Sequence, residues 1–92
     1  MAIVTLRYWA AAKEAAGTAE ETISAGTLAE ALAAAQGKAE DGGRSQQNSR
    51  LQAVFSRSSF LIDGLPVGSR APETVVLSDA AVIEVLPPFA GG

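Results

Sequence analysis

The sequence predicts an α+β domain in which a mixed sheet of four to five strands packs on one main helix. Residues 2–9 alternate apolar and polar side chains, and residues 81–86 form an apolar run; both patterns predict strands. Between them, one amphipathic helix begins at Thr27. A chain of 92 residues is long enough for one domain, which we place at residues 1–86, followed by a flexible C-terminal tail at 87–92.

The segment after the first strand predicts a short helix and then a second strand. Residues 10–16 are rich in alanine and favour a helix, which Gly17 is placed to end. Residues 18–23 are compatible with a strand. A helix this short needs tertiary packing to be stable.

The main helix has the clearest local signature in the chain. Thr27 and Glu30 have the spacing of a capping box. Four apolar residues then recur at helical spacing and predict one buried stripe: Leu28, Ala31, Leu32 and Ala35. We expect Gly37 to end this helix, and residues 38–49, which are polar and lack periodicity, to form a solvated loop.

The second half of the chain predicts short strands separated by turns. Residues 51–57 favour a short helix or the start of a strand. Strands are expected at 59–62 and 65–67, with Asp63-Gly64 as the tight hairpin turn between them. A short extended piece at 74–77 and a turn precede the last strand. The first and last strands are the most apolar, so we expect both to lie in the centre of the sheet.

Composition excludes several classes of function. The chain has no cysteine and no histidine, which rules out disulfides, Ser-His-Asp or Cys-His catalysis and most zinc sites. The net charge is −3 and the basic residues are scattered, so nucleic acid is not an expected partner. No apolar run approaches the roughly 20 residues that span a bilayer, and the first residues lack the charged-then-apolar pattern of a signal peptide. We therefore expect a cytoplasmic protein without membrane contact or bound metal.

The last strand is expected to present a docking surface on its outer face. Alternate side chains of residues 82–86 face opposite sides, so Glu84 and Leu86 should face water, and Arg7 could share their face. Leu86 and Phe89 would then form an exposed apolar patch beside the tail.

The chain ends in Pro-Pro-Phe-Ala-Gly-Gly, which predicts a stiff base with a slim tip. Proline restricts the backbone to extended forms, and glycine lacks the Cβ that a narrow channel would exclude. Four residues beyond Pro88 reach at most roughly 13 Å, enough to carry a carboxylate into another protein's active site. We predict that Gly92 carries the chemistry and that the six preceding residues bind partners: Leu86, Pro87, Pro88, Phe89, Ala90 and Gly91.

At this point the sequence resembles the MoaD/ThiS family of ubiquitin-like sulfur carriers, and in particular the small subunits of molybdopterin synthase (MoaD). The resemblance covers most of the chain outside residues 38–57. The segments that carry it are Tyr8 to Gly17, the helix from Thr27, the Leu77-Ser78-Asp79 turn, the strand from Val82 to Leu86 and the Pro-Pro-x-x-Gly-Gly ending. It implies a ubiquitin-like β-grasp fold with an exposed diglycine tail.

The resemblance also implies a function. An activating enzyme (MoeB-like) would use ATP to adenylate Gly92, and the acyl-adenylate would become a thiocarboxylate. The tail would then enter a large subunit (MoaE-like) and donate sulfur to precursor Z (cyclic pyranopterin monophosphate) in molybdenum cofactor biosynthesis. The chain itself would be a non-catalytic subunit without a bound cofactor. Asp63-Gly64 and Ser78-Asp79-Ala80 depart from the family's usual turns, which loosens the assignment to this one pathway.

Three alternatives stay open from the sequence. The chain could carry sulfur for thiazole or cysteine synthesis. It could be a ubiquitin-like modifier that is joined to lysines by an isopeptide bond. It could also be a β-grasp interaction module whose tail is incidental.

Overall fold

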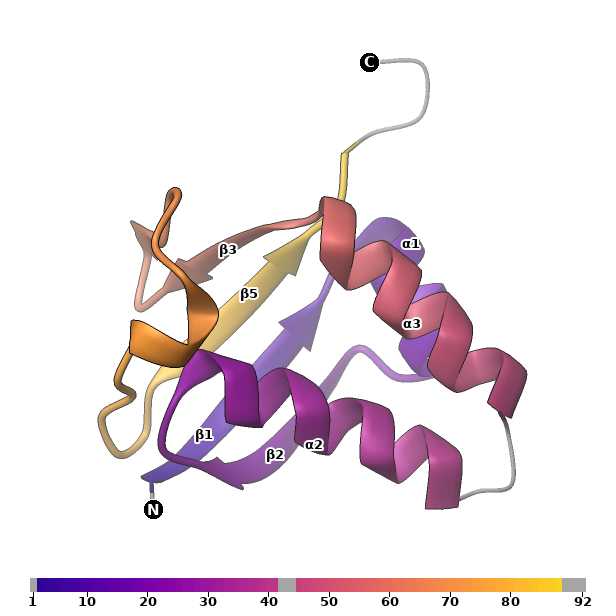
Figure 1. Ribbon diagram of the computed structural model, residues 1–92, viewed down its shortest axis with the longest axis horizontal. Helices are drawn as coiled ribbons and strands as arrows, with labels where there is room; N and C mark the ends of the chain where they lie inside the picture. The colour runs from indigo at the N-terminus through magenta and orange to yellow at the C-terminus, as the bar shows by residue number, and fades with distance from the viewer. Residues whose placement is uncertain (1, 42–44, 89–92) are drawn as a thin grey trace.

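The computed structural model describes residues 2–41 and 45–88. In chain order its elements are β1 (Ala2–Tyr8), α1 (Ala10–Ala16), β2 (Glu20–Ala25), α2 (Leu28–Asp41), α3 (Ser45–Arg57), β3 (Ser59–Ile62), β4 (Leu65–Pro66), the 3-10 helix η1 (Pro72–Thr74) and β5 (Val82–Leu86). The predicted α+β class is confirmed, with α3 as a second long helix beside the one that the sequence indicated (Figure 1).

Within the described residues, five strands form one mixed sheet in the order β2-β1-β5-β3-β4. β5 pairs in parallel with β1 and antiparallel with β3, and β1 pairs antiparallel with β2. The first and last strands therefore lie inside the sheet, as the sequence predicted. Because they run in the same direction, their C-terminal ends meet at one edge of the sheet, above which the chain leaves β5 (Figure 1).

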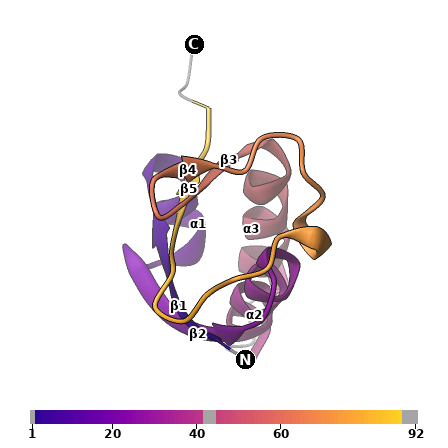
Figure 2. The ribbon, with the colours of Figure 1, turned by 90° about the vertical axis from the view of Figure 1, so that its left-hand side faces the viewer.

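The helices α2 and α3 cover one face of the sheet (Figure 2), and we call the other face the open face. The strands alternate accordingly: Val4, Leu6 and Tyr8 of β1 are buried toward the helices, as are Ile83 and Val85 of β5. The largest fully buried side chains, which form the centre of the core, are Leu6, Leu28, Leu51, Ile83, Val4 and Val85.

At the start of α2, one of the two hydrogen bonds of the predicted capping box is present, and the other has a different partner. The Thr27 hydroxyl accepts a hydrogen bond from the Glu30 amide at 3.2 Å. The Glu30 carboxylate reaches back to the Gly26 amide at 2.7 Å, one residue earlier than in the usual capping box. Both bonds satisfy amides that a helix start would otherwise leave without a partner.

The prediction of a loop over residues 38–49 is wrong. α2 continues through Gly37 to Asp41, and α3 already begins at Ser45. A glycine inside a helix costs only about 1 kcal/mol, which tertiary packing can offset. Contacts of α3 with α1 and α2 provide that packing, so the polar composition of the segment does not decide its structure.

The β3–β4 hairpin is confirmed at the predicted turn. Asp63 and Gly64 both have positive φ angles, 51° and 84°, as a type I′ turn requires. The Asp63 carboxylate also accepts a hydrogen bond from the Val82 amide at 3.0 Å, which ties the turn to the start of β5. The expected extended piece at 74–77 contributes an isolated bridge between Val76 and Thr27 rather than a full strand.

Ala80, just before β5, has a φ of 69°, a left-handed conformation that costs a residue with a Cβ about 1 to 2 kcal/mol. We expect Ala80→Gly to raise the free energy of unfolding by about 0.5 kcal/mol, because relief of this strain exceeds the entropic cost of glycine. The matched control is Ala53→Gly on the exposed side of α3, which should lower it by about 1 kcal/mol. Urea denaturation measures both changes, and equal losses in the two variants would contradict the prediction.

Because of Tyr8, the free energy of unfolding should depend on pH in the alkaline range. Its hydroxyl donates to the Glu21 carboxylate at 2.5 Å, and burial, followed by this hydrogen bond and the Glu21 charge, raises the pKa of Tyr8 far above its usual 10.0. The unfolded chain therefore loses this proton first as pH rises. The stabilisation is complete below pH 10 and should fall by about 1.4 kcal/mol per pH unit above it. Tyr8→Phe should remove this slope, and an unchanged slope between pH 10 and 11 would contradict the assignment.

Candidate functional site: the base of the tail and the open face

The base of the tail is anchored in the centre of the sheet. Leu86 pairs with Ser59 of β3, Pro87 is buried, and Pro88 is exposed. Of the predicted site residues, these are the three that the structure describes: Leu86, Pro87 and Pro88. Phe89, Ala90, Gly91 and Gly92 lie outside the described residues, so their predicted roles stay predictions.

Leu86 lies on the open face, as the alternation predicted, but it is half-buried rather than fully exposed. Glu84, two residues earlier, shares that face and is also half-buried. The reason is the position of β5 in the middle of the sheet, where side chains of both neighbouring strands flank it. Leu61 of β3 stands directly opposite Glu84 and is diagonal to Leu86, which extends the apolar surface beyond the residues that the sequence indicated.

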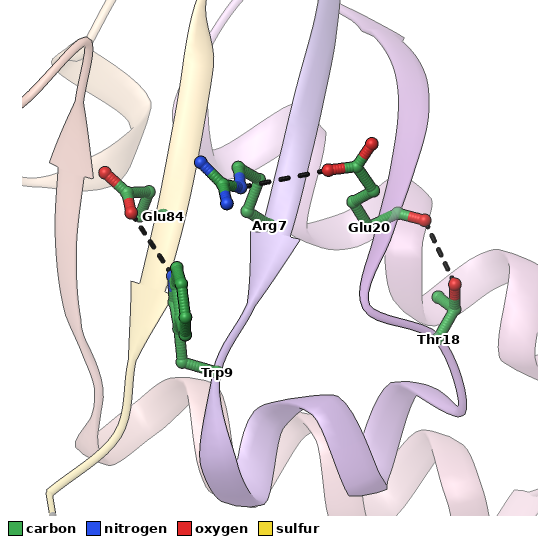
Figure 3. Close-up of polar contacts among 5 residues, drawn as sticks. All are labelled: Arg7, Trp9, Thr18, Glu20 and Glu84. Carbon is green, nitrogen blue, oxygen red and sulfur yellow. Dashed lines mark hydrogen bonds and ion pairs between the residues drawn. The ribbon is translucent and has the colours of Figure 1, made fainter.

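Trp9 is the residue of this site that the sequence analysis missed. It follows β1 directly, and its backbone amide donates to the Val85 carbonyl at 3.3 Å, which holds it beside the end of β5. Its indole nitrogen donates to the Glu84 carboxylate at 3.2 Å, and 43% of its surface is exposed (Figure 3). The signal in the sequence was the single tryptophan of the chain, placed where a strand ends. Partly exposed tryptophans are enriched among residues that dominate protein interfaces.

Arg7 completes a connected set of side chains on the open face. It lies opposite Glu84 in the β1–β5 register, so the two share a face as expected. Its ion pair, however, is with Glu20 of β2 at 3.8 Å, and its guanidinium carbon lies 5.2 Å from the centre of the Trp9 ring (Figure 3). The exposed Arg7–Glu20 pair adds little stability. Its effect is to hold a cation over one face of the indole.

Beside this set, the surface is hollowed where α1 meets β1. A depression of about 440 Å³ is lined in part by Arg7, Trp9, Lys13 and Glu20. Two cations, one carboxylate and an indole therefore surround one hollow next to the edge from which the tail leaves. Such a surface can recognise a partner by charge and by an aromatic contact.

The raised pKa of Tyr8 keeps its phenol protonated near neutral pH. In residues 2–41 and 45–88, no group of three carboxylates, histidines or cysteines could hold a metal ion. None of the described helices is long and apolar enough to cross a membrane.

Comparisons with known proteins identify the fold. No family model matches the sequence, and no curated protein matches it. Among solved structures, the small archaeal modifier protein 1 from Methanosarcina acetivorans is similar, with a TM-score of 0.77 at 24% identity over 100% of this chain and 98% of that one.

Two further solved structures that are similar to this chain are described as molybdopterin-converting factor subunits. A putative molybdopterin converting factor subunit 1 from Pyrococcus furiosus has a TM-score of 0.68 at 18% identity, covering 97% of this chain and all of that one. Subunit 1 in a complex of subunits 1 and 2 of the molybdopterin-converting factor from Helicobacter pylori has a TM-score of 0.60 at 21% identity, covering 98% and 99%. At these identities the likeness establishes the fold, and the chain therefore has a ubiquitin-like β-grasp fold, as its sequence implied.

Proposed function

We propose that this chain is a sulfur carrier whose C-terminal glycine, Gly92, is activated as an adenylate, converted to a thiocarboxylate and used to deliver sulfur to precursor Z in molybdenum cofactor biosynthesis. The observation that carries the proposal is the position of β5. The central strand of a β-grasp sheet leads directly into Pro87-Pro88, and the sequence then continues through Phe89 and Ala90 to a diglycine ending.

The chemistry of the proposal lies in the backbone carbonyl of Gly92. A carboxylate is a poor electrophile, and adenylation by an ATP-using, MoeB-like enzyme provides AMP as a leaving group. A sulfur nucleophile at the sulfide level then displaces AMP. The resulting thiocarboxylate is ionised and nucleophilic at neutral pH, so this chain needs no base of its own. Catalysis belongs to the activating enzyme and to a MoaE-like large subunit, and this chain binds no cofactor.

The open face supports the docking half of the proposal. Trp9, Glu84 and Leu86 lie together at the edge where the tail leaves, so a partner that covers them also receives the tail. The structure of the molybdopterin-converting factor complex from Helicobacter pylori contains a chain of this fold together with a second subunit. That precedent supports a partner of the large-subunit kind.

A ubiquitin-like modifier is the second candidate, and the likeness to the small archaeal modifier protein 1 favours it. The two functions share activation of Gly92 and differ in the nucleophile that follows. Intact-mass spectrometry after incubation with an activating enzyme, ATP and sulfide separates them. A thiocarboxylate adds about 16 Da to the free chain. A modifier instead forms conjugates with lysines that appear as ladders on blots, and a mere interaction module shows neither change.

The tail itself provides the first functional prediction. Gly91→Val and deletion of Gly92 should each abolish sulfur transfer, because a Cβ blocks a narrow channel and a shortened tail misplaces the carbonyl. Both should leave the free energy of unfolding within about 0.5 kcal/mol of the parent. Single-turnover sulfur transfer and urea denaturation measure the two effects.

The control for the tail is Ala33→Val, which also introduces a valine, but on the exposed side of α2, and should transfer sulfur normally. Loss of folding in the tail variants, in parallel with loss of transfer, would show that the tail is structural and would contradict the proposal.

The open face provides the second prediction. Trp9→Ala should weaken binding of a MoaE-like large subunit about 30-fold, the typical effect of removing a central interface tryptophan. Leu86→Asp should also weaken it, because a charge would be placed in an apolar contact. Isothermal titration calorimetry measures both.

Leu65→Ala is the matched control for binding. Leu65 is 69% exposed, but it lies in the β3–β4 hairpin at the opposite edge of the sheet from β2. Its loss should leave the affinity unchanged. If Trp9→Ala and Leu65→Ala bound equally well, the open face around Trp9 would not be the docking surface.

A further inference from the structure

A second hollow, of about 420 Å³, lies on the helix side of the sheet, and we call it the groove. It is bounded by α2, α3 and β3 and by the segment that follows β4, residues 67–72. Figure 2 shows this segment, in orange, on the same side of the sheet as α2 and α3. The apolar lining consists of buried and half-buried residues: Leu28, Leu32, Phe55, Phe60 and Val67.

The groove is open to solvent along its rim. Gln52, Ser56 and Arg70 line it and are exposed. A free small ligand is usually buried over most of its surface in its pocket, which an open groove does not provide. A side chain that projects from another protein needs only one such groove, because its own protein covers the rest of it. The shape therefore favours a protein segment as the occupant.

Arg70 gives the groove a cation with unused hydrogen-bond donors. Its guanidinium donates to the Val67 carbonyl at 3.0 Å and to the Pro66 carbonyl at 3.4 Å, which takes up two of its five N–H groups. No carboxylate whose position the structure describes forms an ion pair with Arg70, and no described residue of the lining is acidic. The chain as a whole has a net charge of −3, so attraction of an anion to the groove has to come from Arg70 itself.

The apolar part of the groove contains a pair of aromatic rings. The rings of Phe55 and Phe60 meet edge to face, with their centres 6.3 Å apart and an angle of 64° between their planes. Phe60 is only half-buried, so the pair has surface left for a further contact. An aromatic or another large apolar side chain can pack there. One hollow therefore offers both an apolar contact and a partner for a carboxylate.

We propose that the groove binds a segment of a partner protein that presents a large apolar side chain and a carboxylate on the same side. The apolar side chain packs on Phe55 and Phe60, and the carboxylate pairs with Arg70. Phe60 stands opposite the buried Val85, so the groove belongs to the helix face of the sheet. A partner in the groove can therefore bind while another protein covers the open face around Glu84. This inference does not depend on the proposed function.

The test uses the full-length chain alone and two peptide probes. The acidic probe is N-acetyl-Ser-Phe-Ser-Asp-Ser-amide, whose phenylalanine and aspartate lie on one side when the peptide is extended. The neutral probe has asparagine in place of the aspartate. NMR titration should give saturable shift changes at Phe55, Phe60 and Arg70, with the acidic probe bound about tenfold more tightly. In Arg70→Gln, the two probes should bind within about twofold of each other.

Gln52→Glu tests the same contact with the hydrogen bonds of Arg70 intact. Gln52 is exposed, so this variant keeps the fold even if Arg70→Gln loosens the segment after β4 and loses both probes. The added charge should weaken binding of the acidic probe at least about fivefold and of the neutral probe less than about twofold. Equal effects on both probes would contradict the proposal.

The matched controls are Glu73→Gln, because Glu73 is exposed on η1 and does not line the groove, and Trp9→Ala on the open face. Both should leave the two affinities within about twofold of the parent. The proposal is wrong if the parent binds both probes equally, or if the shift changes centre on Trp9. It is also wrong if the Phe55 signals change on dilution without a probe, because a second copy of the chain would then occupy the groove. None of these results involves sulfur transfer, so they do not decide the proposed function.

Discussion

The parallel pairing of β1 with β5 is the constraint on which the rest of this structure depends. It places the two most apolar strands side by side, and Leu6, Ile83 and Val85 become fully buried. A parallel pair also brings two C-terminal ends to one edge of the sheet. The end of β1 carries Trp9 and the end of β5 carries Pro87, so a recognition residue and the tail base become neighbours although they are far apart in the sequence.

Because side chains alternate along β5, the two faces of the sheet differ at the C-terminal end of this strand. On the open face, Glu84 accepts a hydrogen bond from Trp9, Leu86 lies on the same face as Glu84, and Arg7 stands over the indole ring. These contacts are too exposed to contribute much stability, and the proposed function gives them a role in selecting a partner. On the helix face, Pro87 is buried, as are Ile83 and Val85.

The division of labour in the proposed function follows from what the side chains lack. A chain without histidine or cysteine has few groups that titrate near neutral pH, and the tyrosine of the core is kept protonated. In the proposed function, reactivity is created at the backbone carbonyl of Gly92 by another protein. What this chain can supply is position: a rigid sheet, a tail base held by a strand pairing and two prolines that limit how the next residues bend.

The sequence by itself determined the strands at both ends, the Thr27 cap, the Asp63-Gly64 turn and the fold class, because period-two alternation, caps and turn residues act over a few neighbours. It left residues 51–57 open between a short helix and the start of a strand, and the helix is correct there. It did not indicate that this helix begins at Ser45, because residues 45–50 are polar and lack an apolar period. The role of Trp9 as a site residue was decided by tertiary structure alone. It depends on which strands and helices become neighbours, and that is settled by burying one common core rather than by any local run of residues.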